Sequence, residues 1–510
     1  MKKFILAILL FYGCFTFSQN VELEKLSTGE LINFSHILTK EGDLYGYISL
    51  YDLKKKGQNK TKEFEYVILD KNLNPVANKK FSAEEHVTSY IVSTYINNKG
   101  ITLTPPKMQK IADSKQTVLE GQTLKIRLDD NSIESPTFIS MDENNKVVFS
   151  DKNISYKDYK DKIEAQKKAN KYYNSVNYSF LPDDTYLVTT KQVYDKYDSN
   201  NVMIKFDANQ QEEWRYSYNN NGNAQDNERI KILDTDANNI YFLKQIQRKD
   251  HITTYLEVIS LKTGKQVAKN EIKNANINTL DHFFANFNSY LFSRKFEDRN
   301  LYILFTVNDD GKEDGFMRVI LDKKNYTFNT LAQYFDEGFK QKIPALTKDL
   351  EFANGYRLLL KDALIFENNS VGLLFEKVKF VENKGVLSEN IVIATFDQDF
   401  DFSSVHSFKK DELLITSTYL YSQYLKQNNG AVFYYLTREP QDETKKSKTY
   451  KLSLNINSIV DNKLRKDVLP LIEDENKRII PYLAKEGYIL LNEQNRKDKT
   501  NTMRLERLNF

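Results

Sequence analysis

The sequence is poor in cysteine, glycine, proline and tryptophan. Its 510 residues include one Cys, 17 Gly, 9 Pro and one Trp. So little Gly and Pro excludes collagen-like and Gly/Pro-rich disordered chains, and a single Cys excludes a disulfide-stapled scaffold. In contrast, 32 Tyr and 32 Phe within an apolar fraction of 40% supply enough surface for a sizeable core. We therefore predict a globular protein.

The sequence also lacks an apolar run long enough to cross a membrane. Lys2 and Lys3 precede an apolar run over residues 4–15, which falls short of the roughly 20 residues that a spanning helix needs. Thr16-Phe17-Ser18 then offers small residues where a signal peptidase cleaves. We predict a signal peptide over residues 1–19 and an exported chain, periplasmic or extracellular, without a transmembrane segment.

The single cysteine, Cys14, lies inside the predicted signal peptide and follows Gly13. A lipid attached to Cys14 would anchor the chain to a membrane. The bulky Phe11 and Tyr12 before it differ from the residues of lipoprotein signals, so we expect Cys14 to be removed with the signal. The mature chain would then hold no thiol for catalysis, metal binding or disulfides.

Neither sign of charge dominates the sequence. The 73 Lys and Arg nearly balance the 70 Asp and Glu, and the two signs are interspersed along the chain. A nucleic-acid partner would require a concentrated basic face. We therefore expect no nucleic-acid partner.

A repeated unit of Asn or Asp residues followed by an aromatic and aliphatic strand runs along the chain. We interpret these strands as the first strand of each unit, and their spacings are 55, 61, 70, 60 and 56 residues. The markers are Tyr186, Tyr241, Tyr302, Gly372, Val432 and Tyr488. An earlier strand at Tyr45 leaves room for one or two further units before Tyr186.

Such units fit propeller blades, which have four strands in roughly 40 to 50 residues. The predicted fold is all-β: a single β-propeller of seven or eight blades over residues 20–510. A helical insertion is expected near residues 157–173, where helix-forming residues gather. We expect the last strand, over residues 503–510, to close the ring against residues 32–38. Two stacked β-sandwich domains are the alternative.

An apolar residue followed by Asp ends several predicted strands. A carboxylate there can accept a hydrogen bond from the backbone two residues on, which favours the turn that closes a hairpin. We therefore interpret these residues as turn residues: Asp70, Asp142, Asp207, Asp322 and Asp397.

The signal ending in Phe17-Ser18-Gln19 and the Asn/Asp-aromatic strand starts resemble those of exported β-propeller-like proteins of Gram-negative, flavobacterial-type bacteria. The resemblance implies an exported propeller. The Asp boxes of sialidases, the Gly pairs of kelch blades and the Trp-Asp endings of other propellers are missing. The lone Trp214 cannot supply the tryptophan docking of quinone-dependent dehydrogenases.

Two acidic segments are candidate calcium sites. Asp234, Asp236 and Asn238 place oxygen ligands at positions one, three and five of a calcium loop, but Asn239 and Gln245 stand where Gly and a bidentate Glu are needed. The second candidate, Asp397, Asp399 and Asp401, has carboxylates at alternate positions.

We favour hairpin turns for both segments and keep calcium as the alternative. No other cofactor is expected, because the five His residues show no metal-ligand spacing.

No catalytic motif identifies a reaction. Gly-x-Ser-x-Gly and phosphate-binding Gly loops are absent from the sequence. Tyr419, Tyr421 and Tyr424 could stack on sugars, although we favour packing. We predict a non-catalytic binding or scaffolding propeller that recognises a protein or glycan partner. The alternative is a glycan-active hydrolase or lyase with carboxylates at the mouth of the propeller channel.

Overall fold

A computed structural model of the chain describes residues 20–508 with internal gaps. The gaps are residues 40–42, 93–99, 106–107, 113–114, 120–122, 135–136, 142–145, 151–160, 162–173, 182–184, 193–200, 219–225, 249–250, 274–290, 297–299, 308–314, 335–336, 344–345, 347–351, 353, 382–384, 410–412, 415–417, 426–429, 441–449, 461–462 and 472–475. The predicted signal peptide, Cys14 and nearly all of the predicted helical insertion at residues 157–173 lie outside the described residues.

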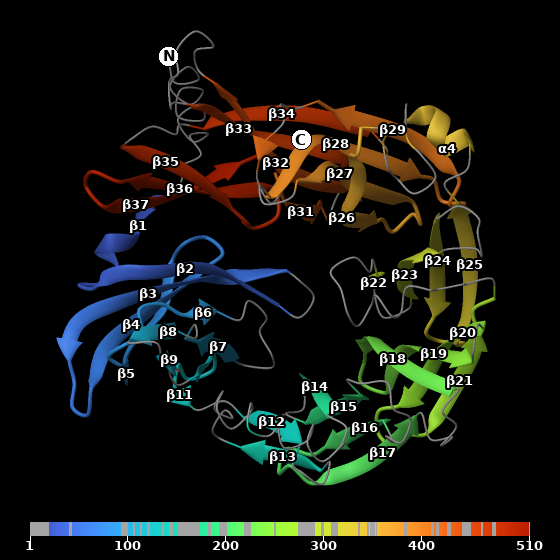
Figure 1. Ribbon diagram of the computed structural model, residues 1–510, viewed down its shortest axis with the longest axis horizontal. Helices are drawn as coiled ribbons and strands as arrows, with labels where there is room; N and C mark the ends of the chain where they lie inside the picture. Colours follow the sequence, from blue (N-terminus) through green and yellow to red (C-terminus); the bar gives the residue numbers. More distant parts are fainter. Residues whose placement is uncertain are drawn as a thin grey trace, which may run out of the picture.

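Eight antiparallel sheets of four strands form a ring (Figure 1). The prediction of an all-β propeller is confirmed, with eight blades, and the alternative of two β-sandwich domains is wrong. In each blade the strands follow one another in chain order, apart from the blade that contains both ends of the described chain. We number the blades 1 to 8 along the chain.

The first four blades lie in the N-terminal half of the chain. Blade 1 contains β2 (Glu30–Leu38), β3 (Leu44–Lys56), β4 (Thr61–Asp70) and β5 (Pro75–Glu84). Blade 2 contains β6 (Ile91–Val92), β7 (Gly100–Thr104), β10 (Leu124–Arg127) and β11 (Ile133–Glu134). Blade 3 contains β14 (Asn174–Phe180), β15 (Tyr186–Gln192), β16 (Asn201–Phe206) and β17 (Glu212–Tyr218). Blade 4 contains β18 (Asp226–Thr235), β19 (Asn239–Arg248), β20 (His251–Ser260) and β21 (Gln266–Glu271).

The other four blades complete the ring. Blade 5 contains β22 (Leu291–Phe296), β23 (Asn300–Val307), β24 (Gly315–Asp322) and β25 (Thr327–Tyr334). Blade 6 contains β26 (Arg357–Ile365), β27 (Val371–Val381), β28 (Gly385–Phe396) and β29 (Phe402–Phe408), and β30 (Leu413–Leu414) pairs with β28. Blade 7 contains β31 (Tyr419–Leu425), β32 (Gly430–Pro440), β33 (Tyr450–Val460) and β34 (Lys463–Leu471). Blade 8 contains β35 (Lys477–Tyr482), β36 (Tyr488–Asn495), β37 (Thr500–Arg507) and β1 (Asn20–Glu22).

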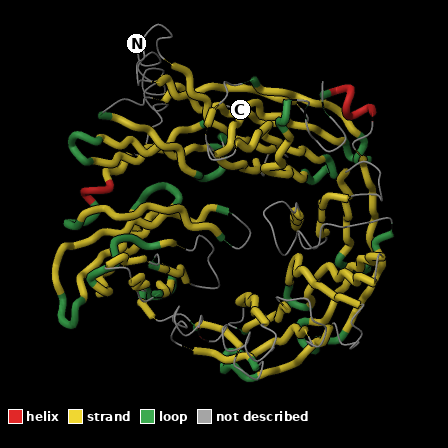
Figure 2. Tube along the Cα trace, in the orientation of Figure 1, coloured by secondary structure: helices red, strands yellow, loops and turns green. Residues whose placement is uncertain are grey.

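Two hairpins and two short helices complete the described structure. The hairpin β8–β9 (Met108–Ala112, Lys115–Leu119) lies between β7 and β10 of blade 2, and the hairpin β12–β13 (Phe138–Met141, Val147–Ser150) lies between blades 2 and 3 in the chain. The described helices are η1 (Leu23–Lys25) and α4 (Glu337–Lys342), which the sequence did not predict (Figure 2). No helix among the described residues is long and apolar enough to cross a membrane.

The repeated markers identify the second strand of each blade, so their interpretation as first strands is wrong. Tyr186 begins β15 and Tyr488 begins β36, and both strands are second in their sheets. A second strand has a neighbour on both sides and packs against the adjacent blades with both faces. It therefore carries the longest apolar run, whereas the first strands mix polar and apolar residues.

Ring closure joins the two ends of the chain. The three residues of β1 pair antiparallel with β37, with Val21 opposite Met503. The predicted partner of the last strand, residues 32–38, belongs instead to the first strand of blade 1. Closure is therefore confirmed and its partner segment corrected. A short outer strand before blade 1 suffices, because β35, β36 and β37 already build the rest of blade 8.

The hydrophobic core lies between neighbouring blades. Phe433 of blade 7 packs with Ile393 of blade 6, and Leu490 of blade 8 packs with Tyr47 of blade 1. The hairpin β12–β13 packs through Ile139 against blade 3. Each interface buries apolar surface from two sheets, so the blades stabilise one another around the ring.

The predicted Asp turns follow the third strand of a blade. Asp70 Oδ1 accepts hydrogen bonds from the backbone N–H of Asn72 and Asn74, each at 2.8 Å. Asp207, Asp322 and Asp397 accept equivalent bonds, and Asp142 lies outside the described residues. These carboxylates are turn residues, as predicted.

Candidate functional site

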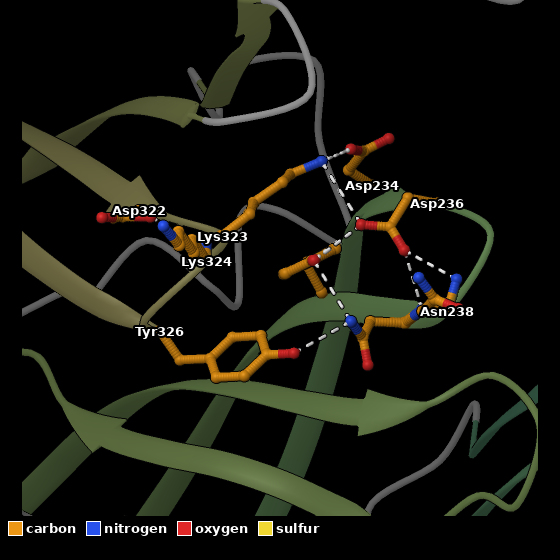
Figure 3. A network of polar contacts seen from close by, with 9 residues as sticks. Asp234, Asp236, Asn238, Asp322, Lys323, Lys324 and Tyr326 are labelled. Atoms are coloured by element: carbon orange, nitrogen blue, oxygen red, sulfur yellow. Dashed lines mark hydrogen bonds and ion pairs between the residues drawn. The ribbon is translucent and has the colours of Figure 1, made fainter.

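The first calcium candidate lies at the boundary between blades 4 and 5 (Figure 3). Asp234 is on β18, directly after a register shift that begins at Ile232. Its Oδ2 lies 2.5 Å from the Nζ of Lys323, which follows β24 of blade 5, and Asp236 Oδ2 lies 3.9 Å from the same Nζ. Only 4% of the Lys323 side chain is exposed. The buried ammonium group of Lys323 therefore lies beside Asp234 and Asp236, the two carboxylates predicted as candidate metal ligands.

The third candidate ligand, Asn238, contributes its backbone to a turn. Its N–H and that of Asn239 donate to Asp236 Oδ1 at 2.9 and 2.8 Å, and the Tyr241 hydroxyl donates to Asp236 Oδ2 at 2.7 Å. Burial opposes ionisation of Asp236, but these hydrogen bonds and the charge of Lys323 outweigh it and lower the pKa of Asp236. The favoured interpretation of a turn fits this geometry.

The second candidate, Asp397, Asp399 and Asp401, also forms a hairpin turn. Asp397 Oδ1 accepts the backbone N–H of Asp399 at 3.0 Å and that of Asp401 at 2.9 Å. The side chains of Asp399 and Asp401 are exposed. Among the described residues, no group of three or more His, Cys, Asp or Glu side chains is arranged to hold a metal ion.

A different polar group lies on the first strands of three consecutive blades, near the centre of the ring (Figure 1). We call it the axial cluster. It consists of Arg294 on β22, Asp362 on β26, and Tyr419, Ser422 and Tyr424 on β31. All five side chains are partly exposed.

Arg294 connects blade 5 to both of the following blades. Its guanidinium carbon lies 3.4 Å from the centroid of the Tyr424 ring in blade 7, and its Nη1 donates to the backbone carbonyl of Ile365 in blade 6. Such a stack combines cation–π attraction with planar packing. A contact that passes over one blade is possible only where the first strands converge, so Arg294 and Tyr424 lie on the inner side of the ring.

Tyr424 is held in place by the backbone of blade 6. Its hydroxyl accepts the Ile365 N–H at 2.9 Å and donates to the Ala363 carbonyl at 3.3 Å. The ring also packs edge-on against Phe366. The Tyr424 ring is therefore fixed before any ligand binds.

Asp362 is the carboxylate of the axial cluster. The Tyr419 hydroxyl donates to its Oδ2 at 2.9 Å and the Ala363 N–H donates to its Oδ1 at 2.8 Å, while Ser422 adds a further hydrogen bond. Desolvation outweighs these bonds and raises the pKa of Asp362 above its ordinary value. The pKa of Tyr419 is also raised, chiefly by burial and then by the nearby Asp362.

Two further acids act on Arg294 through space. Burial lowers the pKa of its guanidinium, whereas Tyr424, Glu367 and Asp43 act in the opposite direction. Asp43 lies in the connection between β2 and β3 of blade 1, and blades 6, 7 and 8 separate that blade from blade 5 along the ring. The electrostatic surroundings of Arg294 thus include acids from more than one blade.

Sequence reasoning identified part of this cluster. Tyr419 and Tyr424 were considered as stacking residues, but Arg294 and Asp362 were missed. Each of the two lies on the strand that precedes an apolar marker strand. Once the marker strand is known to be the second strand of its blade, the strand before it can be predicted to be the inner strand.

Comparisons with known proteins assign no family to the chain. No protein-family model matches the chain, and no curated protein sequence is significantly similar. The chain is similar to the solved WD40 domain of SCAP from fission yeast, with 7% identity, a TM-score of 0.37, and coverage of 96% of this chain and 97% of that one.

Two carbohydrate-active enzymes are also similar in structure. An endo-arabinase from Bacteroides thetaiotaomicron has 12% identity and a TM-score of 0.21 over 56% of this chain and 94% of that one. A rhamnogalacturonan lyase from Bacillus licheniformis has 7% identity and a TM-score of 0.26 over 93% and 90%. Similarity at these values assigns neither an activity nor a ligand.

Proposed function

We propose that this protein is an exported propeller that binds a protein or glycan partner at the axial cluster without transforming it. The observation that carries the proposal is the stack of Arg294 on Tyr424, which joins blade 5 to blade 7. Arg and Tyr are the residues that most often dominate binding energy at interfaces. Here both are fixed by backbone hydrogen bonds, so little side-chain entropy is lost on binding.

The state of Asp362 also supports binding in preference to catalysis. Its two oxygens already accept hydrogen bonds from the Ala363 N–H and the Tyr419 hydroxyl. A general acid or base must instead reach the proton of a substrate directly or through one water. These bonds give Asp362 a positioning role for Tyr419 and Ser422.

The second candidate function is that of a glycan-active enzyme in which Asp362 is the acid. One observation favours it: burial raises the pKa of Asp362, which is how a carboxyl group becomes a proton donor near neutral pH. In this case Tyr419 would have to release Asp362 when substrate binds.

A glycan panel distinguishes the two functions. We would incubate residues 20–510 with the panel and follow both binding and the release of new reducing ends or unsaturated products. Binding without turnover is expected. Turnover that disappears in Asp362→Asn would overturn the binding proposal and establish the second candidate.

A labelled residue beside the cluster tests its location. Ser293 is exposed on β22 next to Arg294, so Ser293→Cys can carry a fluorophore or a photo-crosslinker. The axial cluster predicts that a bound partner changes the fluorescence or is crosslinked there. The same label at Ser82→Cys, exposed on the outer strand β5, is the control and should not respond.

A further inference from the structure

Aromatic side chains continue from the axial cluster around the inner side of the ring. Tyr421 on β31 donates its hydroxyl to the backbone carbonyl of Tyr482 on β35, at 3.0 Å. The Tyr482 ring lies 5.3 Å, edge to face, from Phe34 on β2. We call Tyr421, Tyr482 and Phe34 the aromatic wall, and it spans blades 7, 8 and 1.

The aromatic wall lies on the inner side of the ring. Each of the three side chains is partly exposed, and each lies on the first strand of its blade. On the outer side they are covered by second-strand residues, because Phe34 stacks on the buried Tyr47 at 5.6 Å and Tyr421 packs on the buried Tyr434 at 4.5 Å. A ligand in the centre of the ring would therefore meet the strands that carry these rings.

The polar groups next to the wall are suited to hydroxyl groups. Asp362, Tyr419 and Ser422 already form a network of hydroxyl and carboxylate groups within one blade interface. Hydroxyl groups of a ligand can both donate to and accept from such a network. The aromatic faces of the wall suit apolar C–H groups of a ligand, and the network suits its hydroxyl groups. The surface of a sugar ring carries both kinds of group.

The charges around the site disfavour an acidic ligand. Among the described residues, the charged groups that act electrostatically on Arg294, Tyr419 or Tyr482 are the basic Arg478 and the acidic Asp43, Asp362 and Glu367. Counting Arg294 itself, the basic groups do not outnumber the acidic ones, so these groups offer an anionic ligand no excess of positive charge. A neutral ligand needs none.

We propose that the axial cluster and the aromatic wall together bind a neutral glycan chain, with sugar rings stacked on Phe34 and Tyr482 and hydroxyls bound by the Asp362 network. This inference rests on the proposed function, because it names the ligand class of the same site. It excludes polyuronates and sulfated glycans as preferred ligands.

Isothermal titration calorimetry on residues 20–510 tests the ligand class. The probes are linear hexasaccharides of glucose, xylose and arabinose, and the acidic probe is hexagalacturonate. We expect at least one neutral hexasaccharide to bind at least tenfold more tightly than hexagalacturonate. Tighter binding of hexagalacturonate would overturn the inference and leave the proposed function intact, since the site would still bind a partner.

Matched variants test the wall itself. Phe34→Leu and Tyr482→Leu keep an apolar side chain but remove the flat face, and each should weaken neutral-glycan binding at least tenfold. Phe34→Trp keeps a flat face and should retain binding. Phe433→Leu, at a fully buried position of blade 7, is the control: it should lower the unfolding temperature without changing the affinity.

Three results would count against the wall, the glycan or both proposals. Equal loss of affinity in Phe433→Leu and Phe34→Leu would overturn the role of the wall, because destabilisation alone would explain the loss. Absence of binding by every hexasaccharide, together with crosslinking of a protein partner at Ser293→Cys, would overturn the glycan and preserve the proposed function. Absence of both would overturn the two proposals together.

Discussion

The Nζ of Lys323 lies 2.5 Å from Asp234 Oδ2, and this buried ion pair joins blade 5 to blade 4. The two residues are 89 positions apart in the chain. Asp236, at 3.9 Å from the same Nζ, adds a second carboxylate. A buried ammonium between two carboxylates is held by attraction that solvent screens little.

We predict that Lys323→Met lowers the free energy of unfolding by about 1–3 kcal/mol, because it leaves the partly exposed carboxylates of Asp234 and Asp236 without their cation. Urea unfolding followed by tryptophan fluorescence measures the effect, since Trp214 is buried in neighbouring blade 3. The control is Lys25→Met. Lys25 forms an exposed pair with Glu22, and losing an exposed pair should change stability by less than about 1 kcal/mol. Equal effects of the two substitutions would show that the Lys323 pair contributes little.

A fully buried carboxylate, Glu376, should be more sensitive still. It lies on β27 of blade 6, is fully buried, and accepts the backbone N–H and the hydroxyl of Thr418 at 2.8 and 2.6 Å. Lys361 Nζ lies 3.1 Å from its other oxygen. Glu376→Ala should therefore lower the free energy of unfolding by about 3–5 kcal/mol, since it leaves Lys361 and the N–H and hydroxyl of Thr418 without their acceptor.

Its control is Glu389→Ala on the neighbouring strand β28. Glu389 also pairs with a lysine, Lys377 at 2.6 Å, but its side chain is 31% exposed. When that carboxylate is removed, Lys377 keeps the rings of Phe352 and Tyr356, at 4.5 and 5.0 Å from its Nζ, and a loss below about 1 kcal/mol is expected. Chemical unfolding of the two variants side by side decides whether the Glu376 bonds hold blades 6 and 7 together.

The sequence carried enough local information to predict the blades and their turns. Each second strand carries an apolar stretch near its start, where both of its faces are buried, and this pattern is visible without a structure. The Asx turns at Asp70 and Asp397 depend on residues two to four positions away, so they too could be predicted. Whether a marker strand is first or second in its blade depends on pairing between strands, which the local pattern does not contain.

The candidate site could not be predicted in the same way. Lys323 faces Asp234 and Arg294 stacks on Tyr424 only because the ring brings distant strands together. Neither partner stands in a motif. Tyr419 and Tyr424 were recognisable as aromatic residues, but nothing near them in the sequence indicates that Asp362 and Arg294 are their neighbours.

A left-handed turn position offers a stabilising substitution. Gln210 has a φ of 64° and is exposed, in the turn that begins at Asp207. Such a φ strains a residue with a side chain but not glycine, so Gln210→Gly should raise the unfolding free energy by about 0.5–1 kcal/mol. Asn209→Gly in the same turn, where φ is not positive, should lower it instead. A higher free energy of unfolding in both variants, or in neither, would contradict the strain argument.

The same substitution should have the opposite sign at Phe400. This residue also has a positive φ, 67°, but it is buried against the core between blades 5 and 6. Phe400→Gly relieves the strain and loses the packing of a phenyl ring, which costs about 3–5 kcal/mol. The variant should therefore be clearly less stable than the parent in the same urea titration.

Because the pKa of Asp362 is raised in the folded protein, the contribution of Asp362 to the free energy of unfolding decreases as the pH rises. Its folded-state pKa lies above the ordinary value of about 3.9, so the folded protein holds a proton that the unfolded chain has already released. This contribution is fully present below about pH 3.9 and is lost as the pH rises through the folded-state pKa. Asp362→Asn abolishes the titration, so the variant should gain stability relative to the parent between pH 4 and pH 8.

Asp236 provides the control of opposite sign for Asp362. Its folded-state pKa is lowered, so its contribution is present above about pH 3.9 and is lost as the pH falls through the folded-state pKa. Asp236→Asn should therefore lose stability relative to the parent, and the loss should be larger at pH 7 than at pH 3. Urea unfolding of the parent and both variants at pH 3, 4, 7 and 8 measures these differences. If the two variants shift in the same direction with pH, the desolvation of Asp362 does not outweigh its hydrogen bonds, and its assigned pKa direction is wrong.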